Sequence, residues 1–280
     1  MSKFLKKSNP ALPFIIIALA IALISLLVYF VTKKSENSDD KKANPAEIVN
    51  SSGLDKDKKV NDVEGVEEVL AKWIEANPQA IINSVSNMQK KVMEEQMKNA
   101  QKNIGEKKDE LFADKKSPQY SPSGYDVTIV EFYDYACGYC KKAQSSVEEL
   151  IKDDKKVRVI YRDFPILGQL SKEMAEVSIA VNLIEPSAFK KFHDALMVSN
   201  EKGKDGAIRV AKSVGINMSK LESALSKDKA KIEKLIEENI ALGGSIGING
   251  TPGFVIGEEL IPGALDVSAL KEKISAVRKK

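Results

Sequence analysis

Two cysteines, Cys137 and Cys140, are the residues whose type and spacing point most clearly to chemistry. They are the only cysteines in the sequence, and Gly138 and Tyr139 lie between them. In the first turn of a helix this spacing brings the two Cα atoms within roughly 5–6 Å, close enough for a disulfide bond. The motif therefore predicts a redox-active Cys137–Cys140 disulfide, and we expect no separate cofactor.

The flanking residues predict different roles for the two sulfur atoms. A β-branched and aromatic run at 127–133 precedes the motif, and the helical pattern AQSSVEELIKD follows it. At a helix N-terminus the unpaired backbone N–H groups and the helix dipole stabilise a thiolate, so we expect Cys137 to have a lowered pKa and high reactivity. Cys140, one turn farther along the helix, is expected to resolve a mixed disulfide from a shielded position.

Other uses of the cysteine pair have less support in the sequence. A structural zinc site needs about four ligands, whereas the chain has two cysteines and one histidine, His193. We therefore expect no metal site. His193 lies in the helical pattern FKKFHDAL, which predicts a place on a helix surface. Two alternatives stay open: a copper-binding or copper-tolerance protein whose reduced pair binds Cu(I), and a scaffold with a purely structural disulfide.

The elements that must position the motif alternate between strand and helix. Strands are predicted at 127–133 and 157–161, on either side of the helix that follows the motif. This order implies a parallel pair of strands joined by a right-handed crossover. Short helices follow from about 169 to 243, then two short strands within GTPGFVIGEELIPG and a helix at 267–277. The predicted fold class is α/β with a helical insertion.

The N-terminus predicts export. The apolar run from Phe14 to Val31 spans 18 residues behind a lysine-bearing start. That length suffices to cross a membrane, and no A-x-A cleavage site follows it. We expect residues 1–34 to be an uncleaved signal anchor, with a cleaved signal peptide as the alternative. In either case the rest of the chain enters an oxidising compartment, where paired cysteines tend to form a disulfide.

The polar stretch 35–61 predicts a flexible tether. Residues 62–116 then show two helical stripes separated at Asn77–Pro78, because a residue before proline is disfavoured in a helix. The second stripe has the four-three-four spacing of a short coiled-coil seam: Ile81, Val85, Met88 and Val92. It predicts a homo-oligomer formed through residues 62–100, with packing on the chain's own domain as the alternative. A linker is expected at 117–125, which has two prolines and no apolar periodicity.

The charge distribution argues against a nucleic-acid partner. Residues 1–34 carry five lysines and no acidic residue, so they account for more than the whole net charge of +3. The rest of the chain is close to neutral, with Lys and Glu interleaved. A nucleic-acid-binding surface needs a clustered basic excess, which this pattern does not supply.

The segment VEFYDYACGYCKKA, followed far downstream by GTPGFVIG, resembles the DsbA-like group of bacterial thioredoxin-fold oxidoreductases over about residues 124–280. The resemblance implies a thioredoxin fold over 126–280, with about 169–243 as its helical insertion. Residues 62–116, with LAKWIEANPQAI, NMQKKV and ELFAD, are similar to the N-terminal oligomerisation region of the ScsC-like branch. The resemblance therefore implies a protein-disulfide oxidoreductase, either an oxidase or an isomerase.

The resemblance also implies roles for individual residues. Cys137 matches the attacking cysteine of the family, and Cys140 matches the resolving cysteine. Thr251–Pro252 matches the family's cis-proline loop, which lies against the disulfide and offers backbone groups to a substrate chain. Glu131, six residues before Cys137, matches a buried acid that accepts the proton of Cys140.

Between the cysteines the chain departs from many oxidases of the family, which carry Pro-His there. Gly138 and Tyr139 supply no cation to the thiolate, and they look more like the DsbC-type isomerases. We expect both residues to contact the substrate and the disulfide to be less oxidising, which favours reduction or reshuffling. The expected partners are secreted or envelope proteins, whose disulfides the protein forms or reshuffles, and a membrane redox partner. The expected location is the periplasm, with the protein anchored to the inner membrane or released after signal cleavage.

Overall fold

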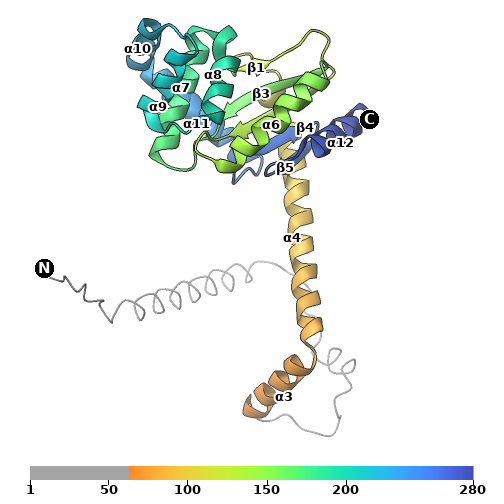
Figure 1. The fold of residues 1–280 in the computed structure, drawn as a ribbon. Helices are drawn as coiled ribbons and strands as arrows, with labels where there is room; N and C mark the ends of the chain where they lie inside the picture. The colour runs from red at the N-terminus through yellow and green to blue at the C-terminus, as the bar shows by residue number, and fades with distance from the viewer. Residues whose placement is uncertain (1–62, 280) are drawn as a thin grey trace, which may run out of the picture. The chain divides into compact units, whose positions relative to one another are not determined.

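The computed structural model describes residues 63–279 (Figure 1). The chain divides into two compact units, Met1–Ala76 and Asn77–Lys280. In the first unit the described residues form one amphipathic helix, α3 (Val63–Ala76), whose Leu70 and Ile74 side chains are exposed. Among the described residues, no helix combines the length and apolar character needed to cross a membrane. The apolar run at 14–31, predicted to be a signal anchor or signal peptide, lies outside the described residues.

The second unit contains a mixed five-stranded sheet in the order β1-β3-β2-β4-β5. The central strand β2 pairs in parallel with β3 and antiparallel with β4, and β1 and β5 add antiparallel edges. The predicted parallel pair and its helical crossover are therefore confirmed, and the fold is a thioredoxin-like α/β fold. The strands are β1 (Gln119–Tyr120), β2 (Val127–Tyr133), β3 (Val157–Asp163), β4 (Gly253–Ile256) and β5 (Glu259–Pro262).

One face of the sheet is covered by the crossover helix, the C-terminal helix and most of the helical insertion (Figure 1). From β2, Ile129 and Tyr133 point into this larger core because side chains alternate along a strand. The helices are α6 (Gly138–Asp153), α7 (Gln169–Ile184), α8 (Pro186–Val198), α9 (Gly203–Ser213), α10 (Met218–Lys227), α11 (Lys229–Ser245) and α12 (Val267–Arg278).

The other face of the sheet packs against the helices that precede it. These are α4 (Pro78–Glu106) and α5 (Lys108–Phe112), which bury Ile104 and Leu111 against Val130 and Phe132 of β2. A buried ion pair supports this packing: the Arg162 guanidinium of β3 lies 2.9 Å from the Asp114 carboxylate. The C-terminal end of α4 is thereby part of the core of the second unit.

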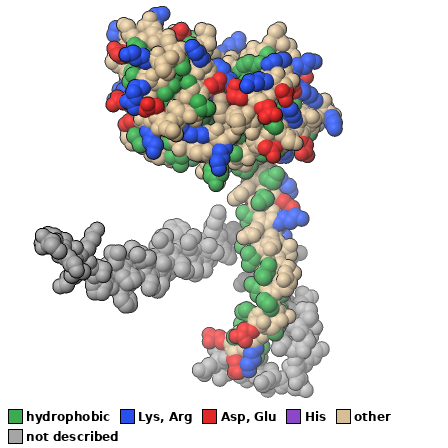
Figure 2. Space-filling view, viewed as in Figure 1, with side chains coloured by type: hydrophobic (Ala, Val, Ile, Leu, Met, Phe, Trp, Pro, Cys, Tyr) green, Lys and Arg blue, Asp and Glu red, His purple; other side chains and the backbone are tan. Residues whose placement is uncertain are grey.

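Most of α4 is exposed and carries apolar side chains (Figure 2). Pro78 occupies the first turn, where its missing N–H has no partner to lose, so α3 and α4 are separate helices as the Asn77–Pro78 pair predicts. The side chains of Ile81, Val85, Met88 and Val92 are all exposed.

The range 117–125, expected to be a linker, contributes the edge strand β1. Gln119 and Tyr120 pair with Ile160 and Val159 of β3. Two residues are too few to show the period-two alternation by which a strand is predicted. The strand was therefore not visible in the sequence pattern.

Candidate functional site

The cysteine motif lies where the chain leaves the central strand. Cys137 is the N-cap residue of α6 and has an extended backbone, and Gly138 begins the helix. Both cysteines are thiols. The Cys137 side chain is slightly exposed, at 7%, whereas Cys140 is fully buried. Gly138 and Tyr139 between them are exposed, Tyr139 at 66%, so these two residues form most of the surface of the motif.

The Thr251–Pro252 segment lies directly beside Cys137. The Cys137 thiol donates a hydrogen bond of 3.2 Å to the carbonyl oxygen of Thr251, which is 114 positions away in the sequence. The Thr251–Pro252 peptide bond is cis. Because β4 runs antiparallel to β2, with Gly253 opposite Phe132, its first residues reach the end of β2 where the motif begins. The sheet register thus brings together the two segments that the sequence marked.

Glu131 is buried in the middle of β2. It faces the same side of the sheet as Ile129 and Tyr133, toward the core that contains Cys140. Its direct neighbour on β3 is Tyr161. In the described part of the chain neither carboxylate oxygen of Glu131 nor the Tyr161 hydroxyl has a hydrogen-bond partner. Burial raises the pKa of Glu131 to about 8, and the nearby Lys190 ammonium limits the rise.

Cys140 is a thiol that ionises with difficulty. Burial raises its pKa far above that of a free cysteine, and charge on Cys137 or Glu131 would raise it further. Two hydrogen bonds act in the opposite direction, one from the Asp134 backbone N–H at 3.5 Å and one from the Thr251 side chain. Cys140 therefore needs a proton acceptor before it can attack a neighbouring sulfur.

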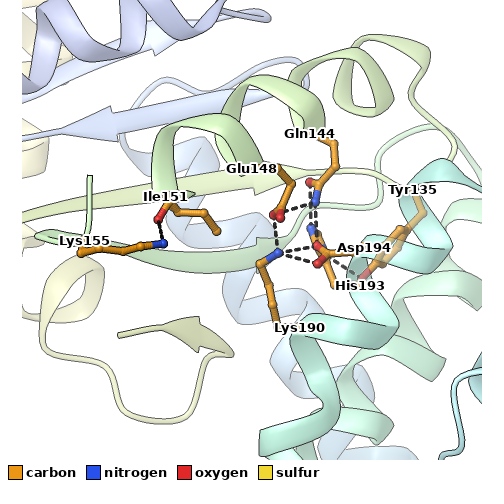
Figure 3. Close-up of polar contacts among 8 residues, drawn as sticks. All are labelled: Tyr135, Gln144, Glu148, Ile151, Lys155, Lys190, His193 and Asp194. Atoms are coloured by element: carbon orange, nitrogen blue, oxygen red, sulfur yellow. Dashed lines mark hydrogen bonds and ion pairs between the residues drawn. The ribbon is translucent and has the colours of Figure 1, made fainter. Parts of the chain in front are cut away.

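His193 is buried, which corrects the prediction that it lies on a helix surface. Its Nδ1 atom lies 3.0 Å from the Tyr135 hydroxyl, and its Nε2 atom lies 3.3 Å from Oε1 of Gln144 (Figure 3). Burial lowers the pKa of His193 well below its usual value, so the ring is neutral at pH 7. His193 lies three or four positions from Phe189, Leu196 and Met197, and these buried residues share one face of α8 with it. The prediction was wrong because His193 belongs to this core-facing side of the helix and not to its exposed side.

Gln144 connects the motif helix to the helical insertion. It lies one turn after Cys140 on α6, and its Nε2 atom donates to Asp194 at 2.7 Å. Lys190 forms ion pairs with Asp194 and with Glu148 of α6. Figure 3 shows these side chains converging between the two helices, while the nearby Lys155 donates to the Ile151 carbonyl at the end of α6. The active-site helix is thus held against α8 by both hydrogen bonds and charges.

Asp134 is a site residue that the sequence analysis did not identify. It is buried between β2 and the motif, and its backbone oxygen accepts a hydrogen bond from the Cys137 N–H at 3.0 Å. Its carboxylate accepts three further backbone hydrogen bonds. Asp134 could have been identified from its position three residues before Cys137, because a carboxylate there lies near the N-terminus of the predicted helix.

Large apolar side chains are exposed around the motif. Tyr139, Ile166, Leu167 and Val198 are each between 39% and 76% exposed. The Asp134 carboxylate binds the backbone of Ile166 and Leu167, and Lys141 of α6 donates to the carbonyl of Ser199, the residue after Val198. The motif is therefore bordered by apolar side chains, which we call the apolar rim.

No metal centre accompanies this site in the part of the chain that the structure describes. Within residues 63–279, His, Cys, Asp and Glu form no group of three or more that is arranged to hold a metal ion.

Comparison with known proteins gives matches over the same region of the chain. The family model described as "DSBA-like thioredoxin domain" matches residues 128–275. The Na(+)/H(+) antiporter NhaA 3 of Salinispora tropica is 24% identical over 159 residues, which are 55% of this chain and 23% of that protein. The chain thus spans about a quarter of the length of the curated relatives it matches.

Three solved structures are matched over nearly their whole length. A thioredoxin-like oxidoreductase from Silicibacter pomeroyi DSS-3 is 35% identical, with a TM-score of 0.57 over 61% of this chain and 98% of that chain. The thiol-disulfide exchange protein alpha-DsbA2 from Wolbachia pipientis is 30% identical, with a TM-score of 0.60 over 64% and 95%. The catalytic domain of Proteus mirabilis ScsC is 28% identical, with a TM-score of 0.59 over 64% and 99%. The chain therefore belongs to the DSBA-like thioredoxin domain family of thiol–disulfide oxidoreductases.

Proposed function

We propose that this protein exchanges disulfides with exported polypeptides, with Cys137 as the attacking thiol and Cys140 as the resolving thiol. The observation that carries the proposal is the placement of Cys137. Cys137 caps the N-terminus of α6 and is 7% exposed as a residue, its sulfur lies 3.2 Å from the Thr251 carbonyl oxygen, and Cys140 is fully buried. An accessible sulfur at a helix N-terminus is suited to attack, and a buried sulfur one turn away is suited to resolution.

The proposed exchange conserves electrons and protons. The Cys137 thiolate attacks one sulfur of a client disulfide, a mixed disulfide forms, and the second client sulfur leaves as a thiolate. Cys140 then loses its proton and attacks the Cys137 sulfur, which releases the client as a dithiol and leaves the Cys137–Cys140 disulfide. The reverse sequence forms a client disulfide. When another client thiol resolves the mixed disulfide, client disulfides are reshuffled.

Glu131 is proposed to accept the proton of Cys140 during resolution. With a pKa of about 8, Glu131 is mostly protonated at pH 7, and its smaller ionised fraction is the form that can accept the proton of Cys140. Its side chain faces the core that contains Cys140, and neither of its oxygens is engaged by another described group. A buried base is required here because burial keeps Cys140 protonated.

A polypeptide client is favoured by the surface around the motif. The apolar rim offers several large side chains next to Cys137, which suits the apolar segments that unfolded or partly folded proteins expose. Gly138 and Tyr139 are proposed to contact the client, because Tyr139 is the most exposed side chain of the motif. Thr251 and Pro252 are proposed to bind the client backbone.

We further propose that the protein acts in the periplasm and exchanges electrons with a membrane redox partner. The apolar run at 14–31 supports export, either as an anchor or as a cleaved signal. Each net oxidation or reduction of a client leaves the Cys137–Cys140 pair in the opposite redox state. Repeated turnover therefore needs a partner that restores the starting state of the pair.

Replacement of the attacking sulfur tests the proposed function most simply. We expect Cys137→Ala to fold with a melting temperature close to that of the reduced wild type but to lose insulin reduction in the presence of dithiothreitol. Cys140→Ala should accumulate the mixed disulfide, because resolution is blocked. Insulin reduction that survives in Cys137→Ala would contradict the proposal, as would failure of this variant to fold.

A second assay on the wild type distinguishes the two directions of exchange. Reactivation of a client with scrambled disulfides would identify reshuffling. Faster disulfide formation in a reduced client, without such reactivation, would identify oxidation.

Glu131→Gln should separate activity from stability. We expect the mixed disulfide to resolve on the order of tenfold or more slowly at pH 7, because the proton acceptor is missing. The variant should lose activity but gain stability against unfolding. Wild-type Glu131 stays protonated in the fold up to its pKa of about 8 but ionises from its ordinary value of 4.5 when unfolded, so its contribution falls as pH rises through this window.

The Glu131→Gln variant should therefore unfold at a higher temperature than the wild type at pH 9 and gain little at pH 4. The gain has an upper limit of roughly 5 kcal/mol, from a shift between 4.5 and about 8. Stopped-flow resolution kinetics and thermal unfolding at both pH values measure the two effects. Glu149→Gln, at an exposed position on α6, is the matched control. Unchanged resolution, or a gain in stability that is equal at pH 4 and pH 9, would refute this role.

Self-association through residues 62–100 is proposed from the exposed stripe on α4. The side chains of Ile81, Val85, Met88 and Val92 are each at least 39% exposed, and burial of such a stripe against a second copy would remove it from water. We expect the protein to sediment as an oligomer and the double variant Val85→Gln with Val92→Gln to sediment as a monomer. Lys90→Gln with Glu94→Gln, on the opposite face of α4, should leave the oligomer intact. A monomeric wild type would exclude the proposal.

A further inference from the structure

Asp134 forms a buried junction between the cysteine motif and a separate loop. The residue is 2% exposed, and its carboxylate accepts three backbone hydrogen bonds. Oδ1 accepts from Ala136 N at 2.8 Å, and Oδ2 accepts from Ile166 N and Leu167 N at 3.1 Å each. A buried carboxylate is costly unless such donors compensate for its lost hydration. These three donors supply that compensation, and two of them come from more than 30 positions away.

The backbone of Asp134 contacts the two cysteines. Its N–H donates to the Cys140 sulfur at 3.5 Å, and its carbonyl accepts from the Cys137 N–H at 3.0 Å. Next to it, Phe164 N donates to the carbonyl of Tyr133 at 2.7 Å, which joins the same two segments again. Asp134 therefore hydrogen-bonds both to the redox pair and to the loop 164–168.

The loop 164–168 presents apolar side chains to solvent. Phe164 is buried and fixes one end of the loop, and Gly168, with a φ of +104°, allows the turn into α7 at the other end. Between them Ile166 and Leu167 are 39% and 55% exposed. The Asp134 carboxylate binds the backbone of these two residues, so their side chains are left free to face outward.

The order of the strands places this loop across the motif from the Thr251–Pro252 segment. The loop follows β3, the Thr251–Pro252 segment precedes β4, and the motif follows β2, which lies between β3 and β4. Parallel pairing of β2 with β3 and antiparallel pairing of β2 with β4 bring all three segments to the same edge of the sheet. A polypeptide that crosses Cys137 from the Thr251–Pro252 segment would next reach Ile166 and Leu167.

We infer that Asp134 is a positioning residue that holds Ile166 and Leu167 against apolar side chains of a polypeptide client, and so sets the preference for polypeptides over small disulfides. The inference rests on the proposed function. The partner that contacts Ile166 and Leu167 is the client chain itself, because Asp134 joins this loop to the motif that attacks the client disulfide. Glutathione disulfide carries no apolar side chain to place against Ile166 and Leu167, so it gains nothing from the loop.

The test compares two substrates at equal enzyme concentration with dithiothreitol as the reductant. The substrates are insulin and glutathione disulfide, and the readout is the ratio of their kcat/KM values. We expect Asp134→Asn to lower this ratio about tenfold, through a higher KM for insulin, because an amide cannot accept from all three N–H groups. The surface variant Ile166→Ser with Leu167→Ser should lower the ratio similarly while Asp134 stays in place. Combining all three substitutions should add little, because both sets remove the same contact.

Matched controls separate this role from general effects. Asp266→Asn alters an aspartate that caps α12 by accepting from Ala269 N at 2.8 Å, and Ile240→Ser alters an exposed aliphatic side chain of α11. Both should keep the wild-type ratio. The inference is overturned if the serine variant keeps the wild-type ratio, whatever the folding of Asp134→Asn. It is also overturned if Asp134→Asn slows both substrates equally. If the wild type reduces neither substrate, the proposed function itself fails.

Discussion

The contact between the Cys137 thiol and the Thr251 carbonyl is the constraint on which the site depends. The two residues are 114 positions apart, and the distance between sulfur and oxygen is 3.2 Å. Three features of the fold produce it: the parallel pair β2–β3, the crossover helix α6 that begins after Cys137, and the antiparallel β4 that returns beside β2. The Cys137 sulfur therefore lies between the N-terminus of α6 and the backbone segment that is proposed to bind a client chain.

Burial then gives the two cysteines different chemistry. Cys137 is 7% exposed at the N-cap of α6, whereas Cys140 is fully buried and is held protonated by its surroundings. The same loss of water raises the pKa of Glu131 to about 8, which brings a buried carboxyl group into the range where it can exchange a proton at physiological pH. One physical cause, the exclusion of water from the space beneath α6, thus accounts for the shielded thiol and for its proposed base.

Local patterns in the sequence predicted much of this arrangement. The strand at 127–133, the helix after Cys137 and the strand from 157 are all visible as runs of characteristic residues, and Asn77–Pro78 marked the boundary between α3 and α4. Contacts that depend on packing were not visible. His193 is buried because the face of α8 that it shares with Phe189 and Leu196 packs into the core, and the partners of the Asp134 carboxylate lie 32 and 33 positions away on another loop. Periodicity describes a single element, and these contacts belong to pairs of elements.

We propose that the fold gives Cys137 and Cys140 unequal reactivity. Limited alkylation of the fully reduced protein with iodoacetamide at pH 7, followed by peptide mass mapping, measures this directly. We expect Cys137 to be labelled at least about tenfold faster than Cys140, because Cys137 caps the N-terminus of α6 whereas Cys140 is fully buried. Equal labelling of the two residues, or faster labelling of Cys140, would contradict it.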